Sequence, residues 1–344
     1  IEPHERVRVH SIPNEVFGHG PTRNLAASIA HGDLLLFTVQ DACPRNDQWM
    51  RKMAHALIEN DLDAVCGGQA VPHDLDKNPA QWYRPLAETN DVEIIRGKQF
   101  EQWSPIQQMD ACGWDNVNAL YRKESLTQIP FQNVRFGEDM TWAKNNLLAH
   151  GNIGYAKNHK IWHYHHQYRG FTRKRTIYVL FWRAKTFDVL PKIAHRPNLL
   201  LPLKVTKAVL RANIRNPLTI LFWIRYNWQT QREVYLAGQE FQRAYLNGKE
   251  EMIELYDSLG EKSHMASHPN SSTITYFPSV TFEKTINRGF YWDDIENPVT
   301  WLTSLFSMTP PCQGTAPVWK KSDFLSVGGW REDIDVGLRN QSAQ

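Results

Sequence analysis

Three groups of polar side chains have residue types that could move a proton or hold a cation. Asp41 directly follows an apolar run and precedes an Ala-Cys-Pro segment. Much further along the chain, Glu138 and Asp139 follow a glycine, and His163 and His165 alternate in a later segment. Carboxylates can accept protons or bind cations, and neutral imidazole is a ligand for Mn²⁺-like ions. These residues are therefore the first candidates for chemistry.

The stretch 33–44 positions Asp41. Its six apolar or β-branched residues run without alternation, which is typical of a strand buried on both faces of a parallel sheet. Ligands of open α/β sheets bind beyond the carboxyl ends of the strands, so a carboxylate here would stand at the mouth of a crevice. An isolated Asp before Ala-Cys-Pro is equally typical of a surface turn, and the neighbouring elements favour the first interpretation.

Those neighbours form an α-β-α-β progression. Segment 20–33 predicts a helix with Pro near its start and Gly at its end, 49–58 predicts a second helix, and 63–67 predicts another short buried strand. This pattern indicates an α/β fold with a mixed, mainly parallel sheet flanked by helices. Arg23 and Asn24 lie at the start of the first helix, where free amides suit phosphate, although Arg23 could equally be a solvated first-turn residue.

The other two groups also have ordinary explanations. Gly137-Glu138-Asp139 opens a predicted helix that runs to Leu148, and acidic residues are favoured in a first helical turn by the helix dipole alone. In an extended segment His163 and His165 share one face, but a single histidine is more often structural than a ligand. The occurrence of all three groups in one α/β chain shifts the balance toward function.

The order of these motifs resembles the family 2 glycosyltransferases, which have the GT-A (Rossmann-like) fold. The residues that carry the resemblance are Arg23-Asn24, Gly32-Asp33, the strand, Gln40-Asp41-Ala42, Pro44 and Trp49, followed by Gly137-Glu138-Asp139 and Trp142. The branch it looks most like is the rhamnosyltransferase-like one. Val39 occupies the first position of the usual Asp-x-Asp signature, so Asp41 is the only carboxylate of that motif.

The resemblance implies a role for each candidate. Asp139 would be the catalytic base and Glu138 would orient the acceptor or the loop. Asp41 would contact a divalent cation (Mg²⁺ or Mn²⁺) or the diphosphate. The other donor contacts would be Arg23, Asn24 and Gln40, and His163 or His165 would complete the metal site. The reaction implied is inverting transfer of a sugar, with dTDP-rhamnose favoured as the donor, to a saccharide or lipid-linked saccharide acceptor in surface-polysaccharide synthesis.

Composition and length set the organisation. The chain has 344 residues and a formal net charge of +3, which does not call for nucleic acid. We expect a GT-A domain over 1–170 that lacks the first strand-helix-strand of the family, a helical extension over 171–262, and a partial second glycosyltransferase-like domain over 263–344. Within that extension, the spacing of the apolar residues from Val234 to Leu259 suggests one long amphipathic helix. Residues 69–108 lack a clear pattern.

Location and alternative functions follow from the same residues. Four scattered cysteines without metal-ligand spacing indicate reduced thiols in a cytoplasmic protein. Neither a signal peptide nor a run long enough to cross a bilayer is visible. The basic helix at 173–185 and the apolar run 218–226 suggest peripheral contact with the inner face of the plasma membrane, although packing against the catalytic domain explains such helices more often.

The alternatives to a glycosyltransferase are a catalytically silent GT-A-like glycan- or partner-binding module and a nucleotidyltransferase.

Overall fold

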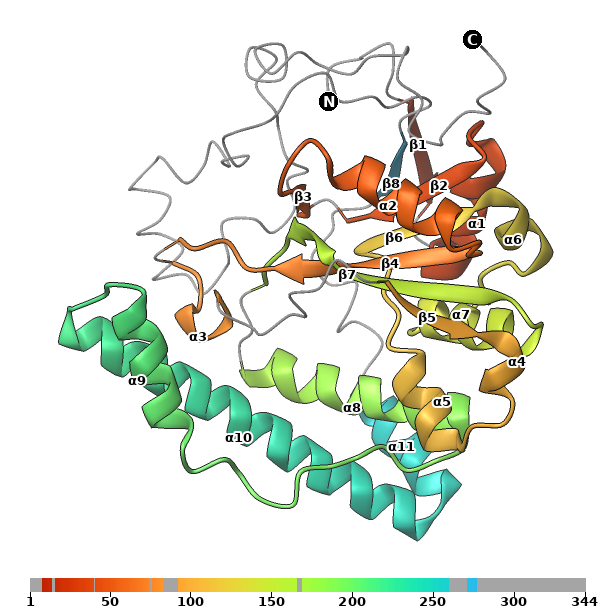
Figure 1. The fold of residues 1–344 in the computed structure, drawn as a ribbon. Coiled ribbons are helices and arrows are strands. Elements are labelled where there is room, and N and C mark those ends of the chain that lie inside the picture. The colour runs from red at the N-terminus through yellow and green to blue at the C-terminus, as the bar shows by residue number, and fades with distance from the viewer. Residues whose placement is uncertain are drawn as a thin grey trace.

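The computed structural model describes residues 8–13, 16–39, 41–74, 76–82, 92–165, 169–259 and 271–276. A six-stranded sheet with helices on both faces forms its centre (Figure 1). The strands of this sheet are β2 (Leu34–Thr38), β3 (Cys43–Pro44), β4 (Ala64–Ala70), β5 (Glu93–Arg96), β6 (Asn118–Arg122) and β7 (Asn152–Trp162). The α/β class expected from the sequence is confirmed.

The sheet is mixed rather than mainly parallel. Its order is β2-β6-β4-β7-β3, with β5 also paired to β7, and β4–β7 is the one parallel pair among these described strands. The expectation of a mainly parallel sheet is therefore wrong, because β6 returns between β2 and β4 in the opposite direction. A strand covered by helices is apolar in either direction, so the run at 33–44 could not distinguish the two arrangements.

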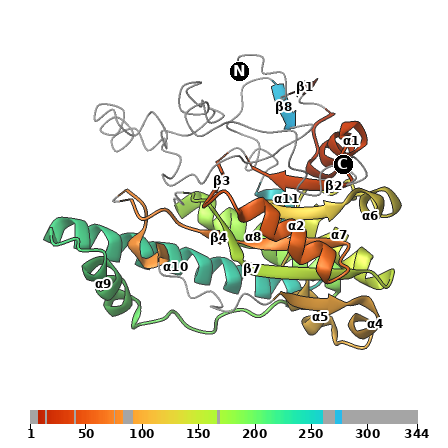
Figure 2. The same ribbon diagram turned by 45° about the horizontal axis from the view of Figure 1, so that its top comes forward.

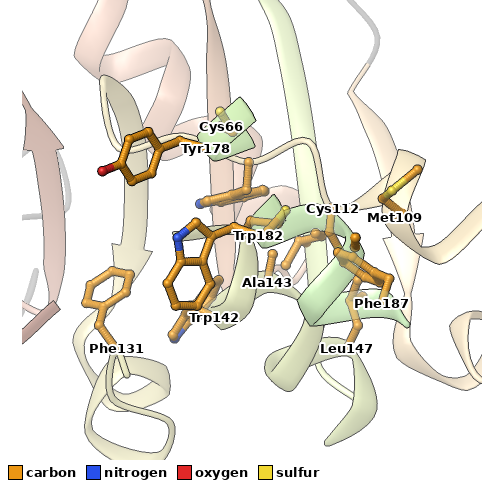
Figure 3. Packing of buried hydrophobic residues seen from close by; sticks show 14 of the residues in the cluster. Cys66, Met109, Cys112, Phe131, Trp142, Ala143, Leu147, Tyr178, Trp182 and Phe187 are labelled. Atoms are coloured by element: carbon orange, nitrogen blue, oxygen red, sulfur yellow. The ribbon is translucent and has the colours of Figure 1, made fainter. Parts of the chain in front are cut away.

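Side chains of adjacent strand residues alternate between the two faces of the sheet. Leu34 and Leu120 pack with α2 (Trp49–Glu59) on one face, whereas Leu35 and Tyr121 face the larger core on the other. That larger core includes Trp142, which is fully buried and lies against Tyr121 with ring centroids 4.7 Å apart. Figure 3 shows this core between the sheet and the helices. The sheet is therefore covered by a buried apolar layer on each face.

The remaining helices cover the sheet and extend beyond it. α1 (His19–Ile29) lies where a helix was expected but ends before Gly32, and α7 (Glu138–Leu148) has the predicted limits. α6 (Lys123–Gln128) was not predicted. The stretch 69–108 is less irregular than expected, since β5 lies within it. Three short helices lie there as well: α3 (Pro79–Trp82), α4 (Gly97–Phe100) and α5 (Pro105–Ala111).

The segment after residue 169 is helical, as predicted. It contains α8 (Arg169–Phe187), α9 (Leu201–Arg211), α10 (Pro217–Asn247) and α11 (Lys249–Ser258). The single long helix expected near the end is interrupted at Gly248, whose φ of 135° is accessible to glycine. The apolar residues of α8, including Ile177 and Phe181, are buried in the same core as the sheet, which confirms the packing explanation for α8. None of the described helices has the length and apolarity needed to cross a membrane.

The N-terminal strand lies outside the main sheet. β1 (Arg8–Pro13) forms a separate antiparallel pair with β8 (Ser271–Tyr276), not an edge of the main sheet. The rest of the predicted second domain at 263–344 lies outside the described residues. Cys43, Cys66 and Cys112 are buried free thiols, as expected, and Cys312 also lies outside the described part.

Candidate functional site

The topology brings polar residues together at one end of four neighbouring strands, which is called the site edge of the sheet here. β2, β4 and β7 run in the same direction, and β6 runs against them. The carboxyl ends of the first three strands therefore meet the start of β6. Asp41 follows β2, Gln69 is next to the last residue of β4, and Asp115 precedes β6. The expectation that Asp41 lies beyond the carboxyl end of a strand is confirmed.

Asp41 forms a compact group with His163 and His165. The two residues of β3 pair with the end of β7, Cys43 opposite Trp162, which brings Asp41, two residues before β3, next to the histidines after β7. An Asp41 carboxylate oxygen lies 3.5 Å from Nε2 of His163 and 3.2 Å from Nε2 of His165. The three ligand atoms all lie within 4.8 Å of one another. Their side chains range from 10% exposed for His163 to 48% for His165.

Gln69 and Asp115 orient His163. The Gln69 amide donates to an Asp115 carboxylate oxygen at 3.0 Å, so its carbonyl oxygen faces Nδ1 of His163 at 2.7 Å. A carbonyl oxygen only accepts, so Nδ1 of His163 carries a proton. The Nε2 atom of His163 then donates to Asp41 when the ring is protonated, and offers a lone pair to a cation when the ring is neutral. Asp115 thus holds the Gln69 side-chain amide, and the Gln69 amide in turn fixes the orientation of the His163 ring. Supports of this kind orient metal-binding histidines.

Burial and neighbouring charges shift the pKa values of the acidic and histidine side chains in this group. Burial alone would raise the pKa of Asp41, but hydrogen bonding and charge from His163, with the charge of His165, lower it below its ordinary value. Burial lowers the pKa of His165, and this effect outweighs the opposing charge of Asp41. Burial raises the pKa of Asp115 despite hydrogen bonds from Val117 and Gln69. When both rings are neutral, their nitrogen lone pairs and the Asp41 carboxylate form a donor set that suits a divalent cation.

Glu138 and Asp139 form a second acidic group at the start of α7. Glu138 is buried and forms an ion pair with Arg23 of α1. Asp139 is half-buried, and one of its oxygens accepts from the Met140 backbone N–H at 2.8 Å. Burial and the neighbouring Glu138 charge raise the pKa of Asp139 to about 7, against the opposing effects of the Met140 N–H and Arg23. A carboxyl group with this pKa is matched to general base catalysis near neutral pH.

The two groups are linked electrostatically through Asp115. Asp115 lies close enough to Asp139 for its charge to raise the pKa of Asp139, and His163 in turn acts on Asp115. Asp115 is thus the electrostatic neighbour that the base and the histidine group share. The geometry joins a potential cation site to a potential proton acceptor.

The remaining predicted donor contacts differ in what the structure shows. Asn24 uses both ends of its amide on the backbone of Phe131: it donates to the carbonyl at 2.8 Å and accepts from the N–H at 3.0 Å. It therefore ties α1 to the segment before α7. Arg23 forms an ion pair with Glu138, the first residue of α7, and so also ties α1 to α7. Gln40 lies outside the described residues.

Three neighbours of the site were not singled out from the sequence. Gln69 and Asp115 stand at strand ends, the same signal that identified Asp41. His19 opens α1, where burial lowers its pKa while the charge of Glu138 acts in the opposite direction. A search for polar residues at every predicted strand end would have found the first two.

Comparison with known proteins gives one partial similarity. No family model matches the chain. The O-antigen chain rhamnosyltransferase WbaN of Salmonella anatum is 29% identical to it over 157 residues, which are 44% of this chain and 48% of that protein. The chain therefore spans about half the length of the curated relative it matches. The similarity supports a glycosyltransferase-like relationship.

Proposed function

We propose that this chain is part of an inverting glycosyltransferase of family 2 type, with a GT-A-like catalytic domain. The proposed donor is an NDP-sugar, with dTDP-rhamnose favoured because the similar Salmonella protein is described as a rhamnosyltransferase. The acceptor is a saccharide or lipid-linked saccharide of a surface polysaccharide such as O-antigen. The observation that carries the proposal is Asp139, a carboxyl group with a pKa raised to about 7 and linked through the charge of Asp115 to the group of Asp41, His163 and His165.

The chemistry is a single displacement. The acceptor hydroxyl gives its proton to the Asp139 carboxylate, its oxygen bonds to the anomeric carbon, and the bond to the nucleoside diphosphate breaks with inversion. Glu138 keeps a negative charge beside Asp139 and so supports a base that holds a proton near neutral pH. Arg23, which pairs with Glu138, holds that acidic residue in position.

Asp41, His163 and His165 are the residues that would hold a divalent cation, Mg²⁺ or Mn²⁺. Their donor set fits such an ion, because Gln69 directs the lone pair of His163 into the group. A cation bound there supplies positive charge for the departing diphosphate. The buried free thiols favour a reducing compartment such as the cytosol as the place of reaction.

Donor turnover by the full-length protein tests the proposal. We expect dTDP-rhamnose with Mn²⁺ to be hydrolysed or transferred, and Asp139→Asn to lower turnover by about 100-fold or more. Asp61→Asn is the matched control, since its side chain is 94% exposed. Product NMR reports the anomeric configuration. Retention of configuration, or full activity in Asp139→Asn, would contradict the assignment of Asp139 as the base.

The second candidate is a catalytically silent GT-A-like module that binds glycans or a partner enzyme. Val39 at the first acidic position of the motif favours it. This candidate predicts binding of nucleotide sugar or glycan, measured by calorimetry, without turnover of any dTDP-, UDP- or GDP-linked donor. Turnover that depends on Asp139 excludes it.

A further inference from the structure

Exposed apolar side chains are concentrated at one end of the helical segment. Among the described residues, seven large apolar side chains that are mostly exposed fall between residues 199 and 222: Leu199, Leu200, Leu203, Leu210, Leu218, Leu221 and Phe222. Leu199 and Leu218 are each 75% exposed. Together with the basic residues of the same helices they are called the α9–α10 surface here. Figures 1 and 2 both show α9 at the end of α10 away from α11, beyond the sheet.

α9 has two apolar faces. Its inner face, with Val205 and Val209, is fully buried in a small core shared with Trp223 of α10. A solvent-facing outer side should then be polar. The outer side instead carries Leu203 and Leu210, with Lys204, Lys207 and Arg211 between and beside them, all of them exposed.

The first turns of α10 continue this surface. Leu218, Leu221 and Phe222 are spaced by three and four residues, so they lie on one side of the helix. Each is at least half exposed. The arrangement is apolar residues with basic neighbours on two adjoining helices, which is typical of elements that lie in the interface of a bilayer.

The charges around this surface have one sign. Residues 189–232 contain no Asp or Glu. The same stretch has eight basic residues: Lys192, Arg196, Lys204, Lys207, Arg211, Arg215, Arg225 and Arg232. Lys192 of this set pairs with Asp110 of α5, and the basic residues that stand beside the apolar side chains are complementary to anionic headgroups.

We propose that the α9–α10 surface binds an anionic phospholipid bilayer, with its leucines in the interface and its lysines and arginines on the headgroups. The basic residues of α8 are used differently. Arg173 forms an ion pair with Glu240, and the Lys185 ammonium lies 4.6 Å from the Trp182 ring centre. Membrane contact is therefore assigned to α9 and α10 and not to residues 173–185.

The surface is connected to the candidate site. Asn227 of α10 and Asn78 exchange two amide hydrogen bonds, of 2.9 and 3.0 Å. The backbone N–H of Asn78 donates to the hydroxyl of Tyr164 at 3.2 Å, and Tyr164 lies between the two histidines of the site. Bilayer binding would hold this histidine loop near the membrane. The proposal does not depend on the transferase assignment, since binding is measured without substrate.

Vesicle flotation tests the proposal with the full-length protein. The probes are phosphatidylcholine vesicles with and without phosphatidylglycerol. The apolar variant Leu218→Ser/Leu221→Ser and the charge variant Lys204→Glu/Lys207→Glu both change exposed side chains. The matched control, Leu246→Ser/Lys249→Glu, changes exposed residues at the opposite end of α10 and at the start of α11. Circular dichroism melting checks that each variant is folded.

We expect the wild type and the control to bind the anionic vesicles equally, and less at high salt. The apolar variant should bind at least about tenfold more weakly. The charge variant should lose most of its preference for phosphatidylglycerol, at least about fivefold for each lysine replaced by glutamate. Absence of wild-type binding would overturn the proposal, as would equal loss in the control. A dimer in light scattering that the apolar variant abolishes, without vesicle binding, would assign the surface to a second copy instead.

Discussion

The raised pKa of Asp139 has a consequence for stability that needs no substrate. A carboxyl group whose pKa is higher in the folded state than in the unfolded chain stabilises the fold at low pH, below its unfolded pKa. That contribution is lost as pH rises through the folded pKa. Asp139 should therefore lower the stability of the wild type at alkaline pH. Asp139→Asn keeps the acceptor for the Met140 N–H but cannot ionise, so it should be relatively more stable at high pH.

The size of the effect follows from the two pKa values. The pKa of Asp139 rises from 3.8 to about 7, with burial as the largest cause and Glu138 as the second. At about pH 5 the unfolded carboxyl is already ionised and the folded one is protonated, and by about pH 8 both are ionised. Over that interval Asp139→Asn should gain about 2 to 3 kcal/mol over the wild type, or about 5–10 °C in Tm.

Urea unfolding of both proteins at the two pH values measures this difference. Comparing the change between pH values cancels any constant cost of the substitution and the titration of distant groups. Asp61→Asn, at a site 94% exposed, is expected to show no such pH-dependent gain. A stability difference between Asp139→Asn and the wild type that stays constant from about pH 5 to about pH 8 would refute the raised pKa and the base assignment built on it.

Three further changes test the supports of the site. Gln69→Ala should weaken Mn²⁺ binding by about 10- to 100-fold in an EPR titration, because the His163 ring loses the acceptor for its Nδ1 proton; unchanged affinity would reject that support. Arg23→Met should cost about 3–5 kcal/mol in urea unfolding, because Glu138 is left buried without its partner, and Arg23→Met/Glu138→Gln should recover most of the loss. Gly20→Ala should lower Tm, since a Cβ atom there would lie 2.2 Å from the Gln132 carbonyl oxygen; an unchanged Tm would show that this segment can shift freely.

Local patterns predicted the elements that carry the site. The Gly-Glu-Asp start and the apolar spacing that follows it are local signals, and α7 has the limits they predict. The apolar run before Asp41 predicted β2 for the same reason. Likewise, alternation placed His163 and His165 together, and the structure gives both access to the Asp41 carboxylate.

Long-range pairing limited what could be predicted. No local sequence pattern indicates that β6 lies between β2 and β4. This antiparallel strand makes the sheet mixed. The support of His163 by Gln69 joins residues 94 positions apart and depends on the parallel pairing of β4 with β7. The capping box of α5, in which Ser104 and Gln107 bond reciprocally, was a local signal for order within 69–108 that the search for apolar patterns overlooked.

Val39 stands where the Asp-x-Asp signature has its first carboxylate, and the strand pairing brings other side chains to Asp41 in its place. Without a second carboxylate in the motif, Asp41 alone would hold a cation weakly. The pairing of β3 with β7 instead brings two imidazoles to Asp41, so the group has three ligand atoms and a single negative charge. Mg²⁺ prefers oxygen ligands, whereas Mn²⁺ accepts imidazole nitrogen more readily. Were a cation bound at this group, two histidines beside a single carboxylate would favour Mn²⁺ over Mg²⁺.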